Sequence, residues 1–196
     1  MFANKTHKKA NEVFKSGDLK KSIILYSKAL KESPNEPIIF SDRGVAYLHS
    51  KEKEKSLADF NRAIELEPDY GYHYAARAFA KNNFGDIDGA IMDYEEAIKI
   101  DPDDFIGQNN LGILLEKKGY QKEAEKRFKI ADSLSKMEDK LFDVIEDIEK
   151  TNNKNKSKNK INKNKKSTKS ELKKLFTSKT QFQEFIKFLK NGLKIK

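Results

Sequence analysis

The sequence predicts an all-α protein: a right-handed α-solenoid of four helix hairpins, then a capping helix, a disordered linker and a terminal amphipathic helix. Three prolines, at positions 34, 68 and 102, are each 34 residues apart. The residues before each proline repeat in the same register, with apolar residues at helical spacing. One helix hairpin cannot bury its apolar faces alone, whereas stacked hairpins can, so this repetition predicts a solenoid.

Each period holds two helices with recurring small, turn and aromatic residues. The first helix carries a small residue at one position, namely Ala10, Gly44, Ala78 and Gly112. A turn residue recurs after it, at Gly17, Gly85 and Gly119, with Lys51 as the exception. The second helix carries an aromatic residue, namely Tyr26, Phe60, Tyr94 and Phe128. Small residues let two antiparallel helices approach closely, and we expect the aromatic residues to fill the space between neighbouring hairpins.

This pattern resembles the tetratricopeptide repeat family. The residues that match in the second repeat are Phe40, Gly44, Tyr47, Ser56, Phe60, Ala63 and Pro68. The predicted array spans 3–138, about 70% of the chain, as repeats 3–36, 37–70, 71–104 and 105–138. Thr6 and Lys9 stand where bulky apolar residues are usual, which suits a terminal repeat whose outer face meets water.

A capping helix is predicted over 136–150. Ser135 and Glu138 form a Ser-x-x-Glu capping box before an apolar stripe at helical spacing. The opposite face of this helix is acidic. We therefore expect it to cover the last repeat and to present charge to the solvent.

Composition and charge limit the classes of function. The chain has no cysteine, which excludes disulfides and thiolate metal sites. Its start has no signal peptide, and no window is apolar enough to cross a membrane, so we expect a cytoplasmic protein. Residues 151–196 contain 15 Lys and two Glu and carry a net charge of +13, whereas residues 1–150 carry −4.

No catalytic constellation is present in the sequence. His7, His49 and His73 lack metal-ligand partners at i+3 or i+4. The acidic segment at 101–104 has Ile106 where a calcium loop requires glycine. The chain also has no Gly-rich phosphate loop. We expect a protein that is not an enzyme and that needs no cofactor or metal.

The resemblance implies a concave surface, lined by the first helices, that binds a peptide or helix of a partner protein. The predicted groove residues are Asn11, Asp42, Val45, His49, Tyr72, Phe79, Asn83, Asn109, Asn110 and Ile113. Asparagine offers a donor and an acceptor together, so Asn11, Asn83, Asn109 and Asn110 could hold a peptide backbone irrespective of its sequence. The competing interpretation is that these asparagines are ordinary solvated surface.

One subgroup of the family clamps a C-terminal carboxylate with lysine, asparagine and arginine. The corresponding positions here are His7, Asn11, Asp42, Tyr72 and Ala76. Only Asn11 matches, and Asp42 would repel a carboxylate. The sequence therefore predicts that the protein does not belong to this group of co-chaperones.

A Lys/Asn-rich segment over 151–170 is predicted to be a disordered linker, because it has too few apolar residues to bury. A basic amphipathic helical tail is predicted over 171–196, with an apolar stripe of Phe182, Phe185, Ile186, Leu189 and Leu193. The candidate basic residues are Lys163, Lys165, Lys166, Lys187 and Lys190. Four interpretations stay open: nucleic-acid binding, contact with an anionic membrane surface, docking on acidic faces of the same chain, and a low-complexity tract without a ligand.

Overall fold

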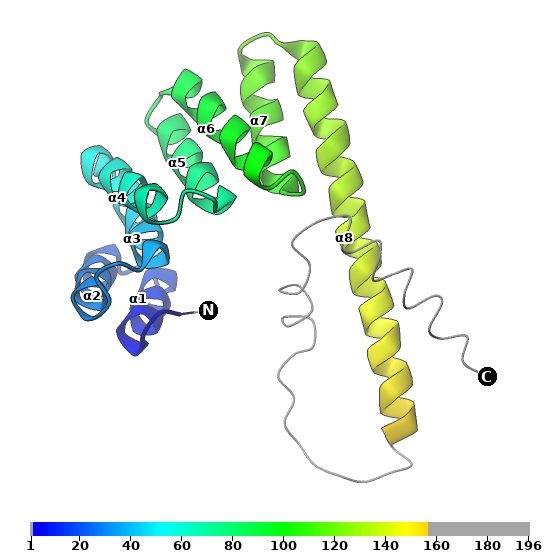
Figure 1. The fold of residues 1–196 in the computed structure, drawn as a ribbon, viewed down its shortest axis with the longest axis horizontal. Coiled ribbons are helices and arrows are strands. Elements are labelled where there is room, and N and C mark those ends of the chain that lie inside the picture. The colour runs from blue at the N-terminus through cyan, green and yellow to red at the C-terminus, as the bar shows by residue number, and fades with distance from the viewer. Residues whose placement is uncertain (1, 157–196) are drawn as a thin grey trace. The chain divides into compact units, whose positions relative to one another are not determined.

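The structure, a computed structural model, describes residues 2–156, and the tail residues named above from Lys163 onward lie outside this range. The described residues form helices joined by short turns (Figure 1). The helices are α1 (Lys5–Lys15), α2 (Leu19–Glu32), α3 (Pro37–His49), α4 (Lys53–Leu66), α5 (Gly71–Asn83), α6 (Ile87–Ile100), α7 (Phe105–Lys117) and α8 (Gln121–Lys156).

The helix boundaries follow the 34-residue period. The second helices of the hairpins begin at Leu19, Lys53, Ile87 and Gln121, and the later first helices begin at Pro37, Gly71 and Phe105. Three of the second helices end two residues before a proline, at Glu32, Leu66 and Ile100. Proline cannot donate a backbone hydrogen bond to continue a helix, so it marks where the chain turns to the next hairpin.

The helices pack as sequential hairpins, which confirms the predicted fold. The hairpin partners α1 and α2, α3 and α4, and α5 and α6 contact each other. Between hairpins, α2 packs on α3 and α4 packs on α5, while α1 contacts α3 and α3 contacts α5. The first helices α1, α3 and α5 therefore form one continuous layer, with α2, α4 and α6 packed on it as their hairpin partners.

The hairpins are closed by an aromatic ring that packs on a small residue. A Cβ added at Gly44 would lie 3.1 Å from the Phe60 ring, and one at Gly112 would lie 2.6 Å from the Phe128 ring. Tyr26 shares a buried cluster with Ala10, as Tyr94 does with Ala78. The aromatic residue thus fills space inside its own hairpin, and Phe60 also shares a cluster with Ala80 of the next one.

Two arginines join neighbouring hairpins through a network that the repeat pattern alone did not reveal. Arg43 donates from Nε and Nη2 to the two carboxylate oxygens of Asp59, both at 2.7 Å, and from Nη1 to Ser27 Oγ at 3.0 Å. Arg77, one repeat later, makes the same paired contact with Asp93 and donates to Asn61 Oδ1. Each guanidinium therefore links the two helices of its own hairpin to the second helix of the preceding one.

The chain divides into two units, one of residues 1–102 and 106–128 and the other of residues 103–105 and 129–196. The hairpins up to Phe128 make up the first unit. The candidate site described below lies within it.

At the end of the array the structure differs from the sequence prediction. The helix expected over 136–150 is continuous with the second helix of repeat four, and 151–156 of the expected linker are helical as well. Ser135 lies inside α8 and is therefore not an N-cap. No proline follows Ala131 where the earlier repeats have one, and Lys136 instead pairs with Asp132 at 2.6 Å across one helical turn. Nothing in the local sequence stops the helix there.

Candidate peptide-binding surface

The layer of first helices brings the predicted groove residues onto α1, α3, α5 and α7. We call this set of residues the first-helix surface: Asn11, Asp42, Val45, His49, Tyr72, Phe79, Asn83, Asn109, Asn110 and Ile113. The structure separates it into exposed apolar side chains on α5 and α7, a polar cluster around Asp42 on α1 and α3, and further asparagines on α5 and α7. These groups differ in exposure and in hydrogen bonding.

The apolar part consists of large side chains that remain exposed. Tyr72, Phe79 and Ile113 expose 43%, 47% and 47% of their surface, and the adjoining Ile106 exposes 59%. Tyr72 and Ile106 occupy the same repeat position, as do Phe79 and Ile113. Two positions of the repeat therefore present apolar groups on successive first helices, which is a feature typical of an interaction surface.

The polar part is organised around the carboxylate of Asp42. Asn11 Nδ2 donates to Asp42 Oδ2 at 2.8 Å, and His7 Nε2 lies 2.8 Å from the same oxygen. His7 Nδ1 accepts the backbone N–H of Ala3, so the ring carries its proton on Nε2 and donates to Asp42. His7 and Asn11 of the first hairpin thus fix this carboxylate of the second hairpin in place, and its Oδ1 makes no hydrogen bond with the described residues.

The charge of Asp42 acts on two tyrosines. Burial and, next in size, the negative charge of Asp42 raise the pKa of Tyr72 to about 12. The same two causes raise the pKa of Tyr26 well above its usual range. Both phenols therefore stay neutral and can act as hydrogen-bond donors at any physiological pH.

The asparagines are not equivalent. Asn83 Nδ2 donates to the carbonyl of Phe79 at 2.8 Å, and Asn110 Nδ2 donates to Tyr94 Oη at 3.2 Å. Asn11 is occupied by Asp42, as described above. Asn109 is exposed, and its side chain makes no hydrogen bond within the described part of the chain. Asn109 is thus the asparagine with both of its polar groups available to a ligand.

Val45 and His49 lie at the edge of this surface. Val45 is half-buried and packs against the cluster of Leu48, Phe60 and Ala80. His49 is exposed, and its ring meets that of Phe14 edge to face, with centroids 5.4 Å apart. Both residues contribute more to packing than to an open polar site.

His73 is a buried group for which the sequence alone suggested no structural role. Its Nε2 donates to Glu67 Oε2 at 3.0 Å, and its Nδ1 accepts from Ser41 Oγ at 2.8 Å. Burial lowers the pKa of His73, while the nearby Glu67 partly opposes that effect. The ring therefore links the third hairpin to Ser41 of the second as a neutral group.

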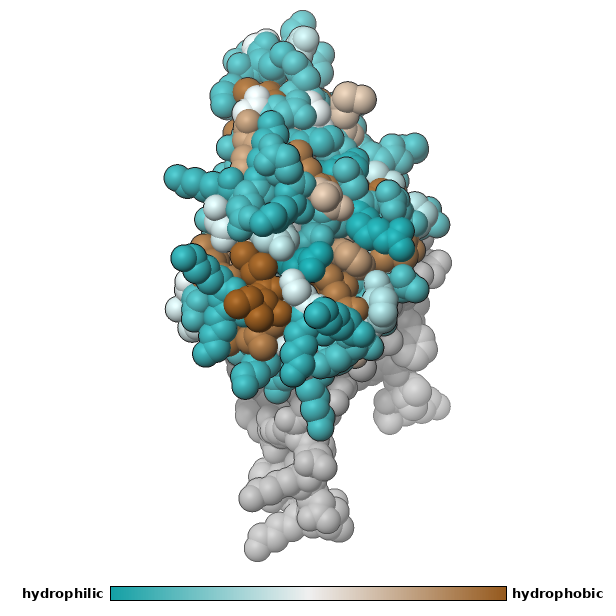
Figure 2. Space-filling view, turned by 90° about the vertical axis from the view of Figure 1, so that its left-hand side faces the viewer, coloured by the Kyte–Doolittle hydropathy of each residue, from teal (hydrophilic) through white to brown (hydrophobic). Residues whose placement is uncertain are grey.

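Other apolar side chains are exposed on the second helices. Ile24 on α2 and Met92 on α6 expose 67% and 69% of their surface, and they occupy the same position two repeats apart. Figure 2 shows the side of the molecule that is at the left in Figure 1: it is largely hydrophilic, with apolar side chains gathered mainly at the height of α2. At this position of the second helices exposed apolar groups do not repeat on successive hairpins, because Ala58 stands between Ile24 and Met92 in the register.

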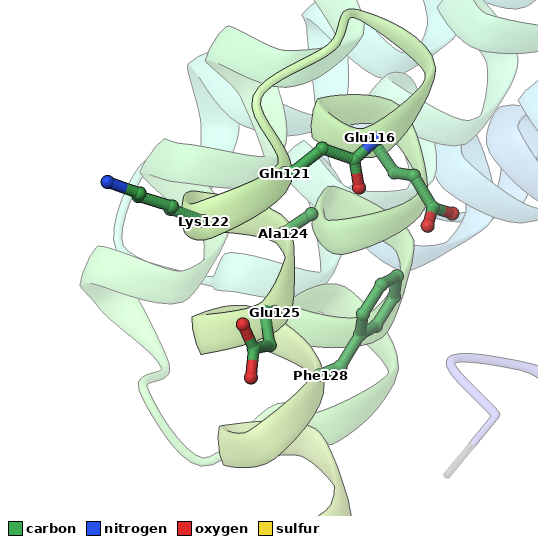
Figure 3. Close-up of a pocket in the computed structure, with 6 residues that line it drawn as sticks. All are labelled: Glu116, Gln121, Lys122, Ala124, Glu125 and Phe128. Atoms are coloured by element: carbon green, nitrogen blue, oxygen red, sulfur yellow. The ribbon is translucent and has the colours of Figure 1, made fainter.

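A pocket of about 290 Å³ lies where α7 ends and α8 begins (Figure 3). Its lining residues are Glu116, Gln121, Lys122, Ala124, Glu125 and Phe128. Among residues 2–156 whose side chains are described, no three His, Asp or Glu side chains come together as a metal site would require. Within the same range no helix is both long and apolar enough to cross a bilayer.

Comparisons with known proteins agree with the fold. The tetratricopeptide repeat family matches residues 40–70, and a family described as TPR repeat matches residues 84–119. No curated protein matches the sequence.

Solved structures similar to this chain include MamA proteins and TPR domains of RPAP3. MamA from Desulfovibrio magneticus RS-1 is 19% identical, with a TM-score of 0.61 over 68% of this chain and 76% of that chain. The first TPR domain of Spaghetti (RPAP3), bound to the HSP90 peptide SRMEEVD, is 26% identical with a TM-score of 0.55, over 58% of this chain and 90% of that one. The first TPR domain of human RPAP3 matches equally well, at 26% identity and a TM-score of 0.55 over 59% and 91% of the two chains.

Proposed function

Because the chain is a tetratricopeptide repeat protein, a class that mediates protein–protein interactions, we propose that its first-helix surface binds a peptide segment or helix of a partner protein. The proposed role is that of a non-catalytic scaffold or adaptor. The observation that carries it is the repeated exposure of Tyr72 with Ile106 and of Phe79 with Ile113 on neighbouring first helices. Fully burying one such side chain contributes about 1.5–3 kcal/mol, so covering several of them can drive binding.

The polar residues would orient the partner. Asn109 supports contact with a peptide backbone, because its amide can donate and accept at once. The fixed carboxylate of Asp42 and the neutral hydroxyl of Tyr72 add an acceptor and a donor. Polar groups of this kind contribute specificity more than affinity.

The test is affinity capture with the full chain and two matched double variants. The first, Phe79→Asp with Ile113→Asp, places charge on the first-helix surface. The second, Ile24→Asp with Met92→Asp, places the same charge on second helices, at side chains that are more exposed than Phe79 and Ile113. We expect the first variant to lose its captured partner and the second to retain it, with equal helicity by circular dichroism. Loss of the captured partner with the second variant only, or unchanged capture with both variants, would contradict the proposal.

The proposed partner is not an acidic chaperone tail. The clamp positions hold His7, Asn11, Asp42, Tyr72 and Ala76, and Asn11 already donates to the Asp42 carboxylate. A second carboxylate beside Asp42 would be repelled. We expect a labelled form of SRMEEVD, the HSP90 peptide bound in the Spaghetti structure, to show no micromolar binding in fluorescence anisotropy.

The basic residues of 151–196 favour a second candidate function, association with nucleic acid or another anionic surface. The 15 lysines of this segment occur without arginine, so phosphate contact is favoured over base recognition. Such binding would weaken steeply with salt, and it would disappear when 151–196 is deleted. Absence of binding even in dilute buffer would exclude it, and a liposome-flotation assay separates the membrane alternative.

A further inference from the structure

The carboxylate of Asp42 carries a negative charge that no cation within residues 2–156 neutralises. Its two hydrogen-bond donors are the amide of Asn11 and the ring of His7. Because Nδ1 of this ring accepts the backbone N–H of Ala3, the ring holds a single proton on Nε2 and is neutral. The two donors therefore fix the position of the carboxylate without cancelling its charge.

Asp59 and Asp93, the buried aspartates of the described chain, differ from Asp42 in this respect. Arg43 pairs with Asp59 and Arg77 pairs with Asp93, each through two contacts of 2.7–2.8 Å. The side chain of Asp42 is 19% exposed, against 8% and 7% for these two, so a ligand can reach it. A carboxylate that is partly removed from water and lacks a counter-charge favours an external cation.

An exposed aromatic ring adjoins this carboxylate. Burial and then the charge of Asp42 raise the pKa of Tyr72, so the two side chains lie close enough to interact. Tyr72 exposes 43% of its surface, and its ring contacts those of Tyr70 and His73, with centroids 5.9 Å and 6.0 Å apart. A lysine or arginine side chain can place its charge on the carboxylate and also contact the face of this ring.

The exposed apolar side chains belong to the same surface. Phe79 follows Tyr72 by two helical turns on one face of α5, and both lie on the helix that packs on α3 and thus on the helix of Asp42. Ile113 is the equivalent of Phe79 on α7, and α5 and α7 share a buried cluster. Phe79 and Ile113 each expose 47% of their surface. One ligand can therefore meet the charge and the apolar groups together.

We propose that the first-helix surface selects its partner by a basic side chain: a lysine or arginine binds Asp42 beside the Tyr72 ring, while neighbouring apolar side chains cover Phe79 and Ile113. This inference rests on the proposed function and adds the chemistry of the partner segment. Charge complementarity favours this occupant, because an acidic or uncharged segment would cover Asp42 without supplying a counter-charge.

The test is selection from a displayed library of random short peptides with the full chain and two variants. Asp42→Asn removes the charge, and its amide oxygen can still accept from His7 and Asn11. Glu12→Gln makes the same change in net charge at an exposed position of α1 outside the first-helix surface. We expect the unmodified chain and Glu12→Gln to select peptides with a lysine or arginine next to apolar residues. Asp42→Asn should select apolar peptides without the basic residue.

One selected peptide, labelled for fluorescence anisotropy, then measures the contribution of the charge. Asp42→Asn, or glutamine in place of the basic residue of the peptide, should each weaken binding at least about tenfold. The two changes together should weaken it little further, because they remove the same interaction. Glu12→Gln should bind the peptide as the unmodified chain does, and circular dichroism should show equal helicity for all three proteins.

The outcomes separate this inference from the proposed function. Selected peptides that lack a basic residue, additive effects of the two changes, or unchanged affinity with Asp42→Asn would overturn the inference alone, if Phe79→Asp with Ile113→Asp still abolishes binding. Binding that survives the latter double variant would contradict the proposed surface itself. If the unmodified chain selected no peptide at all, both the inference and the proposed function would fall.

Discussion

Lys51 holds a backbone conformation that the other repeats assign to glycine. Its φ is +60°, and Gly17, Gly85 and Gly119 have φ of +87° or +88° at the equivalent turn. The hydrogen bonds are the same: the N–H of Lys51 bonds to Leu48 as that of Gly85 does to Asn82. A side chain in the left-handed region costs about 1–2 kcal/mol, and glycine does not incur that cost.

We therefore expect Lys51→Gly to raise the free energy of unfolding by about 1 kcal/mol, as measured by urea denaturation. The control is Gly85→Ala, which introduces a side chain at the same turn position and should lower stability by a similar amount. A Cβ at Gly85 would meet no atom within 4 Å, so the effect would come from the backbone alone. A stability decrease for Lys51→Gly would contradict this account.

His73 makes stability depend on pH. Burial lowers the pKa of His73 below the value of about 6.5 that it has in the unfolded chain. As the pH falls below 6.5, the unfolded state therefore takes up a proton more readily than the folded state, and the folded state loses stability; above pH 6.5 this contribution is fully present.

We expect His73→Gln to show a smaller loss of stability between pH 7.5 and pH 5.5 than the unmodified chain, in urea denaturation at both values. His49→Gln is the matched control, because His49 is exposed and its replacement should leave the pH dependence unchanged. If His73→Gln kept the full pH dependence, groups other than this imidazole would be responsible.

At the scale of the element, each arginine pair couples two hairpins. Asp59 is almost completely buried, and Arg43 supplies both of its short contacts. Removing one partner of a buried pair leaves an uncompensated charge, at a cost of about 3–5 kcal/mol, whereas replacing both by apolar groups is often neutral. The chain itself has Leu111 in repeat four where repeats two and three have arginine.

We expect Arg43→Met to lower the free energy of unfolding by about 3 kcal/mol, and Arg43→Met with Asp59→Leu to restore most of it. Equilibrium denaturation of the two single variants and the double variant measures the coupling between them. Additive effects of the two substitutions would show that the pair does not act as a unit.

The same elements show how far the sequence predicts the fold. Proline and turn residues act locally, and the helices of the structure end next to these residues as far as Lys117. The Ser135–Glu138 capping box wrongly predicted the start of a new helix, because serine is tolerated inside a helix. A stop signal such as proline would have been needed to end α8 before this point. The recurrence of Arg43 and Asp59 as Arg77 and Asp93 is a signal in the sequence that could have predicted the arginine network.

The candidate site was less predictable. Its apolar part follows from the repeat, since Tyr72 and Phe79 recur as Ile106 and Ile113. Its polar part does not, because His7 and Asn11 correspond to Ser41 and Val45 in the next repeat, so the period carries no information about the Asp42 cluster. Contacts between hairpins at positions that vary from repeat to repeat require the three-dimensional structure.

At the scale of the whole molecule, the array is stabilised by contacts between neighbours. From α1 to α6 the described helix contacts join the two helices of a hairpin or two neighbouring hairpins, so we treat stability as a sum of repeat and interface contributions. A defect in the middle of such an array disturbs interfaces on both sides, whereas a defect at its end disturbs one. Phe60 and Phe128 test this, because they occupy the same repeat position in repeats two and four.

Phe60→Ala should lower hydrogen-exchange protection across α1 to α6, because the ring is completely buried and shares a cluster with Leu48 and Ala80 of two adjacent hairpins. The loss should reach about 3–5 kcal/mol in the free energy of unfolding.

Phe128→Ala removes a half-buried ring at the end of the array. It should therefore lower the free energy of unfolding by less, and it should lower hydrogen-exchange protection mainly in α7 and the start of α8. Hydrogen exchange read by mass spectrometry, peptide by peptide, distinguishes the two patterns. Loss of protection in α1 to α4 on Phe128→Ala would mean that the hairpins unfold as one cooperative unit and that the nearest-neighbour description fails.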